Sequence, residues 1–156
     1  MSVHISKKAE LFYKALEDVW SAEQLWTGSP NNALWHCTQA VEKTMKGFLN
    51  CLNTDYDYGH ELKDLLDAVF ELISISPDTA EFINYLNRFG IGLRYKNMST
   101  DPTVDDARIA ISRTKVIIHE FGKHPGVSGA MKEAQEVHKK ILKANYVKSS
   151  KENNQI

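Results

Sequence analysis

The chain has 156 residues, of which 42% are hydrophobic and 25% are charged, and its formal net charge at pH 7 is −1. A chain of this size can bury roughly 70% of its unfolded surface in one core, so we expect a single globular unit. The near-neutral balance excludes a protein that binds nucleic acid as a general polycation. The charge is uneven, however, because residues 122–156 contain seven Lys and three Glu. This basic segment is either a solvated end or a surface for RNA or an acidic partner.

The compartment follows from the apolar runs and the cysteines. The first ten residues contain no apolar run of signal-peptide length, and no stretch approaches the ~18 consecutive apolar residues of a membrane span. On one helix, Cys37 and Cys51 would lie about 21 Å apart, too far for a disulfide. No pair of histidines accompanies them to complete a zinc site. We therefore expect a reduced, cytoplasmic protein with no membrane contact, no metal and no cofactor.

In the first half of the chain, apolar residues recur at three- and four-residue steps, which predicts α-helices rather than strands. We expect a first helix over residues 6–26, with Ser6 as its N-cap and the sequence TGSPN as its end. A second helix should run to about Asn53, capped by Asn31 or Asn32. The tryptophans are expected in the core or at its rim: Trp20, Trp26 and Trp35.

In the second half, the helical period continues between polar loops. A third helix starts near Leu62 and ends near Pro77, and Asp78 caps a fourth. A fifth helix starts at Val104 or Asp105. After an interruption rich in Gly and Pro comes a sixth, more polar helix, and the last nine residues, KSSKENNQI, are expected to fray.

Short loops between these helices favour antiparallel neighbours. We therefore predict an all-α fold, an antiparallel up-and-down helical bundle of about five helices plus a C-terminal helix. Residues 1–126 would form the bundle, and residues 127–156 the additional helix and its basic tail. The apolar stripe of the sixth helix is narrow, so this helix packs either on the bundle or against another subunit.

The second predicted helix contains a polar stripe within the sequence WHCTQAVEKTMKGFL. Four polar residues fall at i, i+3, i+4 and i+7, the spacing of one helix face: Gln39, Glu42, Lys43 and Lys46. A structural interpretation is available, because Glu42 and Lys46 make a favourable i,i+4 pair worth about 0.2–0.5 kcal/mol. The functional interpretation is a surface that binds a ligand.

Three segments, HCTQAVEKTMKGFL, GHELKDLL and LNRFGIGLRY, occur in an order that resembles the HEPN domain of prokaryotes, over about residues 9–121. The residues that match its motifs are Gln39, Ala40, Glu42, Lys43, Lys46, His60, Leu62, Leu65, Arg94 and Tyr95. The resemblance implies a four- or five-helix bundle that is often a homodimer. It also implies a nucleotidyltransferase as a partner protein, because bacterial members frequently act with a minimal enzyme of that class.

From this resemblance we expect a binding partner for nucleotide or RNA, in a toxin–antitoxin or nucleotidyltransferase-linked module. The expected contacts are Arg94, Tyr95, His60, Lys43, Lys46 and Gln39. In this interpretation the polar stripe lies beside Arg94 and forms a basic groove. His60 has an alternative role as a helix cap or loop anchor, and Arg94 as an anchor of the fourth helix.

Some members of the family are metal-independent ribonucleases with an Arg-x(4-6)-His signature after the fourth helix. There a neutral His can take the proton of an RNA 2′-hydroxyl, and an Arg can stabilise the charge on the phosphate. This chain departs from the signature, because the positions that should hold His after Arg94 are Ser99, Thr100 and Asp101. We expect Asp101 to help cap the fifth helix instead.

A second match to the signature consists of Arg113 and His119, six positions apart inside the fifth helix. On a helix the two would be separated by about 9 Å of rise and roughly 120° around the axis, but they could still converge across a dimer interface. Two alternatives to the binding partner therefore stay open. One is a metal-independent endoribonuclease that uses this pair, and the other is a non-catalytic scaffold.

Overall fold

The computed structural model describes residues 3–56, 61–95 and 101–154, with only the backbone described for residues 90–95. The described residues form six α-helices and no strand, which confirms the predicted all-α bundle. The helices are α1 Lys7–Leu25, α2 Pro30–Cys51, α3 Leu62–Phe70, α4 Pro77–Tyr95, α5 Val104–Gly122 and α6 Ser128–Asn153. None of the described helices is both long enough and apolar enough to cross a membrane.

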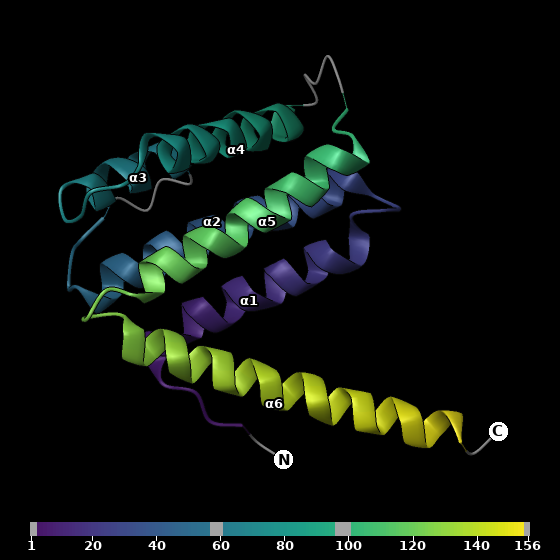
Figure 1. The fold of residues 1–156 in the computed structure, drawn as a ribbon. Coiled ribbons are helices and arrows are strands. Elements are labelled where there is room, and N and C mark those ends of the chain that lie inside the picture. Colours follow the sequence, from purple (N-terminus) through teal and green to yellow (C-terminus); the bar gives the residue numbers. More distant parts are fainter. Residues whose placement is uncertain (1–2, 57–60, 96–100, 155–156) are drawn as a thin grey trace.

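The bundle is organised around α2, which contacts α1, α3, α4 and α5. Figure 1 shows α3 and α4 on one side of α2 and α5, and α6 on the far side of α1. The α4 helix runs antiparallel to α2, so that α4 ends where α2 begins. The order of the layers therefore separates α6 from α3 and α4.

The seam between α1 and α2 is the most closely packed part of the core. Phe12 on α1 is fully buried and lies opposite Gly47 on α2. A Cβ atom added at Gly47 would lie 2.8 Å from Cε1 of Phe12, closer than carbon atoms pack. The missing side chain at this position therefore allows the two helices to approach each other.

The starts of α2 and α4 differ from the predictions. The predicted caps Asn31 and Asn32 lie inside α2, which begins at Pro30 with Ser29 as its N-cap. Proline suits this first helical position, because its missing N–H would have no partner within the helix. Likewise Asp78 lies in the first turn of α4, which begins one residue earlier, at Pro77.

The start of α5 agrees with the prediction, but its cap does not. The helix begins at Val104, and its N-cap is Thr103 rather than Asp101. The Thr103 hydroxyl accepts a hydrogen bond from the Asp106 N–H at 3.0 Å, and the Asp106 carboxylate accepts one from the Thr103 N–H at 2.9 Å. This reciprocal capping box requires no contribution from Asp101.

Two further predictions are wrong. The tail does not fray at residue 148, because α6 continues to Asn153. Trp20 and Trp35 are not core residues, since they are 45% and 39% exposed. Only Trp26 of the three tryptophans packs against the core.

Candidate functional site

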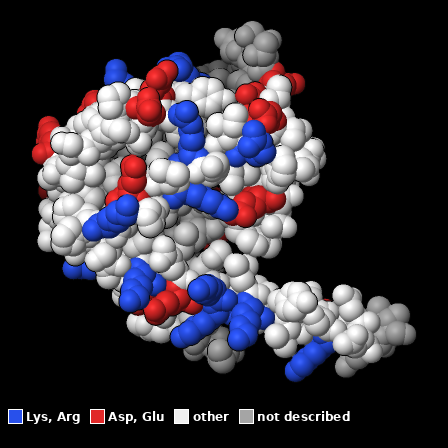
Figure 2. Space-filling model, viewed as in Figure 1, with Lys and Arg blue, Asp and Glu red and all other residues white. Residues whose placement is uncertain are grey.

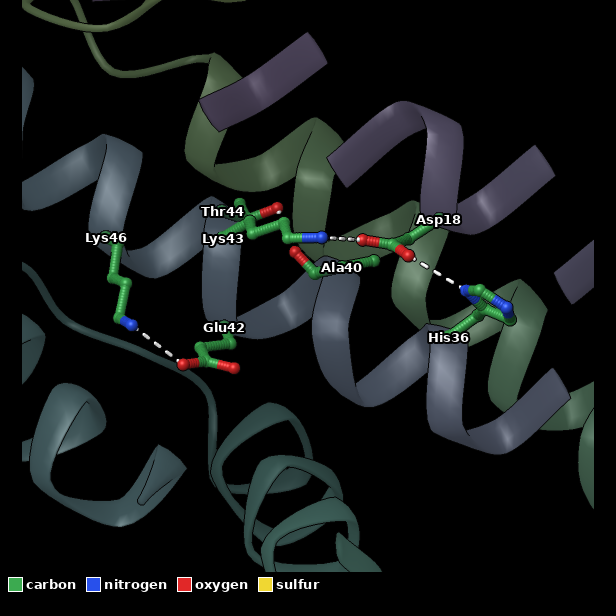
Figure 3. A network of polar contacts seen from close by, with 7 residues as sticks. All are labelled: Asp18, His36, Ala40, Glu42, Lys43, Thr44 and Lys46. Carbon is green, nitrogen blue, oxygen red and sulfur yellow. Dashed lines mark hydrogen bonds and ion pairs between the residues drawn. The ribbon is translucent and has the colours of Figure 1, made fainter. Parts of the chain in front are cut away.

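The polar stripe of α2 does not form one surface. Lys43 points towards α1, where its ammonium group contacts Oδ2 of Asp18 at 2.5 Å. Lys46 lies away from α1 and binds Oε1 of Glu42 at 2.7 Å (Figure 3). Lys43 and Lys46 are three positions apart, so their side chains leave the helix in directions about 60° apart around its axis. The structure thus confirms the i,i+4 pair of the structural interpretation and directs Lys43 to another helix.

Asp18 is the centre of a clamp between α1 and α2. It is only 8% exposed, and its second oxygen contacts Nδ1 of His36 at 2.8 Å. His36 and Lys43 are seven residues apart on α2, so both reach the same carboxylate from one helix face (Figure 3). The positive charge of Lys43 is therefore neutralised inside the protein.

The remaining expected contacts are Gln39, His60, Arg94 and Tyr95. Gln39 is half-buried on α2. His60 lies outside the described residues, as do the side chains of Arg94 and Tyr95. The backbone of Arg94 belongs to the last turn of α4, at the end of the bundle where α2 begins (Figure 1). Lys43 lies thirteen positions into α2, roughly 20 Å along its axis from that end.

A different set of cationic residues occupies α4 and α5. The four arginines of the chain are all on these two helices: Arg88, Arg94, Arg108 and Arg113. Arg88 and Arg113 line a groove of about 330 Å³ between α4 and α5. Arginine presents a planar fork of donors that matches phosphate and carboxylate groups, so this restriction to two adjacent helices marks a candidate anion site.

Aromatic rings accompany the arginines in this groove. The guanidinium carbon of Arg113 lies 5.6 Å from the centre of the Phe82 ring. The Phe82 and Tyr85 rings are 6.2 Å apart with an interplanar angle of 26°. Burial, and next the Asp106 carboxylate, raise the pKa of Tyr85 above its ordinary value of 10, so its hydroxyl remains a hydrogen-bond donor at neutral pH.

Carboxylates complete the lining of the groove: Asp78, Glu81 and Asp106. Asp106 is also held by the capping box of α5. The groove therefore offers hydrogen-bond acceptors as well as two cationic groups. Such a mixed lining suits a ligand that has both hydrogen-bond donors and an anionic group.

The sequence-predicted pair Arg113 and His119 does not form a site within one protomer. Arg113 faces the groove between α4 and α5, whereas His119 lines a separate cleft formed by α1, α5 and α6. Among the residues that the structure describes, no group of three His, Cys, Asp or Glu side chains is arranged to hold a metal ion.

The sequence interpretation overlooked Arg88 and Tyr85. Their signal was present, because arginine occurs nowhere outside residues 88–113 while lysine is spread along the chain. Tyr85 and Arg88 are also three residues apart, which puts them on the same face of α4. Attention to residue type, rather than to positive charge alone, would have found them.

Two solved structures are similar in fold. The protein TT1696 from Thermus thermophilus has 21% identity and a TM-score of 0.67, and the match covers 76% of this chain and 98% of that one. ST0689, an archaeal HEPN homologue, has 18% identity and a TM-score of 0.59, with coverage of 75% and 96%. At these identities the similarity shows the fold alone. No curated protein matches this chain significantly.

The family comparison covers the bundle but not the last helix. The HEPN domain model matches residues 9–124, from the first turn of α1 to the end of α5. The match ends before α6 begins at Ser128. It agrees with the resemblance seen in the three sequence segments and extends over most of the chain. The chain therefore belongs to the HEPN domain family.

Proposed function

We propose that this HEPN-family protein binds a nucleotide in the groove between α4 and α5. The observation that carries the proposal is the placement of two guanidinium groups, on Arg88 and Arg113, beside the neighbouring rings of Phe82 and Tyr85. Arginine binds phosphate through paired hydrogen bonds, and the exposed Tyr85 ring can stack on a base, whereas Phe82, which is only 6% exposed, supports Arg113 from below. One groove thus combines the two kinds of contact that a nucleotide needs.

The arginines of the groove are available for a ligand. Within the described residues, no salt bridge holds Arg88 or Arg113, whereas Arg108 contacts Asp105 at 2.7 Å. Arg113 lies over the Phe82 ring, which leaves its N–H groups free to bind an anion. By contrast, Lys43 and Lys46 already bind carboxylates, so the proposal makes the arginines the principal anion contacts.

The charge of the lining favours a nucleotide over a long RNA. The carboxylates of Asp78, Glu81 and Asp106 outnumber the two arginines and would repel a continuous phosphate backbone. They can instead accept hydrogen bonds from ribose hydroxyls and base amino groups. The groove volume of about 330 Å³ lies at the lower end of the ~300–1,000 Å³ of small-ligand sites.

The proposal includes a role for the end of α4 and a cellular setting. Arg94 and Tyr95 would extend the groove, since they belong to the last turn of the helix that contains Arg88. The protein would act in the cytosol as a homodimer and as the binding partner in a toxin–antitoxin or nucleotidyltransferase-linked module. Its two free, buried cysteines suit a reducing compartment.

Isothermal titration calorimetry with ATP, GTP and a short single-stranded RNA tests the proposal. We expect nucleotide affinity to fall at least tenfold in the double variant Arg88→Ala/Arg113→Ala, because a hydrogen bond to a charged group contributes about 1.5–3 kcal/mol. Arg108→Ala is the control, since it removes one arginine outside the groove and should keep the affinity. Far-UV circular dichroism of each variant checks that the helices remain.

Other results would contradict the proposal in distinguishable ways. If the wild-type protein binds no nucleotide, the non-catalytic scaffold is the better description. If nucleotide affinity is the same in the double variant, the ligand lies elsewhere, and Arg94→Ala then tests the end of α4. Cleavage of RNA in excess EDTA that is lost in His119→Ala would favour the ribonuclease instead.

A further inference from the structure

The groove of the proposed function, here called the first hollow, is continuous with a second hollow between the same two helices. The second hollow has a volume of about 280 Å³ and lies towards the start of α4. Three residues line both hollows: Asp78, Phe82 and Arg113. The two hollows are therefore neighbouring parts of one groove, and they meet at the Arg113 side chain.

The two hollows together extend along most of the facing surfaces of α4 and α5. Beside α4 the lining runs from Ser76, the residue before the helix, to Arg88, which is about 18 Å of helical rise. On α5 it runs from Asp106 to Glu120, which is about 21 Å. A ligand with two parts joined at Arg113 would thus use space that a mononucleotide in the first hollow leaves empty.

The second hollow has a lining that suits a nucleoside rather than a phosphate group. Arg113 is the single cationic residue among its described lining residues, and its other polar groups are the hydroxyls of Ser76 and Thr79 and two carboxylates. A hydrogen bond of 2.9 Å between the Ser76 and Thr79 hydroxyls holds them side by side. Glu120 can accept hydrogen bonds from ribose hydroxyls or base amino groups. Val116, which is 52% exposed, adds an apolar surface for a sugar or a base.

The charges of the groove favour a short phosphate bridge. Arg113 is the one cationic residue that both hollows share, and carboxylates lie on both sides of it, on Glu81 in the first hollow and Glu120 in the second. Figure 2 shows cationic and anionic side chains interspersed over the face of the bundle that carries α4 and α5. A bridge of one or two phosphates can be bound at Arg113, whereas a long phosphate chain would be repelled on either side.

We propose that the groove binds a dinucleotide, in which two nucleosides are joined by a bridge of one or two phosphates. The bridge binds Arg113, one base stacks on the Tyr85 ring in the first hollow, and the second nucleoside occupies the second hollow. This inference rests on the proposed function, because it takes the first hollow as a nucleotide site. A 3′,5′-phosphodiester and a 5′,5′-diphosphate share the required chemistry.

Isothermal titration calorimetry with matched mononucleotides and dinucleotides tests the inference. AMP and GMP are compared with the phosphodiesters ApA and GpG and with the 5′,5′-diphosphates Ap2A and Gp2G. We expect a dinucleotide to bind at least about tenfold more tightly than its mononucleotide, because a hydrogen bond to a charged group such as Glu120 contributes that much. The bridge that gives the larger gain identifies the kind of dinucleotide.

Two variants locate the second nucleoside. Thr79→Ala/Glu120→Ala removes polar groups that line the second hollow but not the first. We expect this variant to bind dinucleotides only as tightly as mononucleotides, while its affinity for mononucleotides stays that of the wild-type protein, which also shows that it is folded. Tyr85→Ala changes the first hollow only and should weaken the binding of both ligands.

The possible failures are distinguishable from one another. If dinucleotides bind no more tightly than mononucleotides, or keep their advantage in Thr79→Ala/Glu120→Ala, the inference is overturned and the proposed function stands. A longer single-stranded RNA that binds far more tightly than ApA and GpG would also overturn it, because the carboxylates would then be no barrier to a phosphate chain. Absence of binding by every mononucleotide and dinucleotide would overturn both proposals.

Discussion

The α1–α2 seam and the α4–α5 groove both contain cationic side chains, but only the groove can offer its charge to a ligand. In the seam, Lys43 is neutralised by Asp18, which is 8% exposed and also contacts His36. In the groove, Arg113 is exposed and lies over an aromatic ring. A pattern of positive residues therefore does not predict a binding surface until the position of the carboxylates is known.

The two regions also differ in what would happen if a ligand competed for the cation. A phosphate that displaced Asp18 from Lys43 would leave a buried carboxylate without its charge partner, which is costly. A phosphate that bound Arg113 would break no ion pair among the described residues and would keep the contact with Phe82. The seam is thus a structural clamp, and the groove is the better ligand site.

The largest effect should come from breaking the clamp with Asp18→Asn. The change leaves the ammonium of Lys43 and the imidazole of His36 without their shared anion. We expect the free energy of unfolding to fall by about 2–4 kcal/mol, measured by urea denaturation. Glu10→Gln is the matched control, because the Glu10–Lys14 pair at 3.1 Å is half-exposed and should cost no more than about 0.5 kcal/mol. Equal losses in the two variants would contradict the clamp.

Overfilling the same seam should have the next largest effect. In Gly47→Ala the new methyl group would meet the Phe12 ring at 2.8 Å. Overpacking costs about 1–3 kcal/mol and the better helix propensity of Ala returns up to about 1, so we expect a net loss of about 1–2 kcal/mol. In the control Gly129→Ala nothing lies within 4 Å, and stability should stay equal or rise slightly. If Gly47→Ala is as stable as the wild-type protein, α1 and α2 can move apart enough to accommodate the methyl group, and the prediction is wrong.

Removal of the groove arginines should lower the free energy of unfolding far less than removal of the Asp18 clamp. For Arg88→Ala/Arg113→Ala we expect the free energy of unfolding to change by at most about 1 kcal/mol, since both side chains are exposed and only the cation–π contact is lost. Thermal and urea denaturation measure this directly. A loss as large as that of Asp18→Asn would mean that these arginines are structural and would weaken the nucleotide proposal.

The smallest effect concerns His138, at the seam between α1 and α6. Burial lowers the pKa of His138 below its ordinary value of 6.5, although Glu17 and Glu23 oppose the shift. As the pH falls through 6.5 the unfolded chain gains the proton first, so stability declines until the pH passes the folded-state pKa. His138→Gln should make the loss of stability between pH 7.5 and 5.5 shallower. The exposed His4→Gln is the control, and an identical slope in both variants would contradict this account.

The helices could be predicted because the apolar period is a local property of the chain. The start of α5 at Val104 followed from that pattern, whereas the caps depended on single side chains whose choice was ambiguous. The binding of Lys43 by Asp18 had no local signal, because the two residues are 25 positions apart. The arginine groove had a signal in residue type, but its partner Phe82 is 31 positions before Arg113.

The amino-acid sequence by itself determined the all-α class, the six helices and the membership of the HEPN family, because helical periodicity and motif order are properties of neighbouring positions along the chain. Tertiary structure alone decided which cations are neutralised and where Arg113 and His119 face. It also decided that the second half of α6 extends beyond the bundle. These properties depend on which side chains meet across helices. Charge availability and burial are set by such distant neighbours, and no spacing within one helix encodes them.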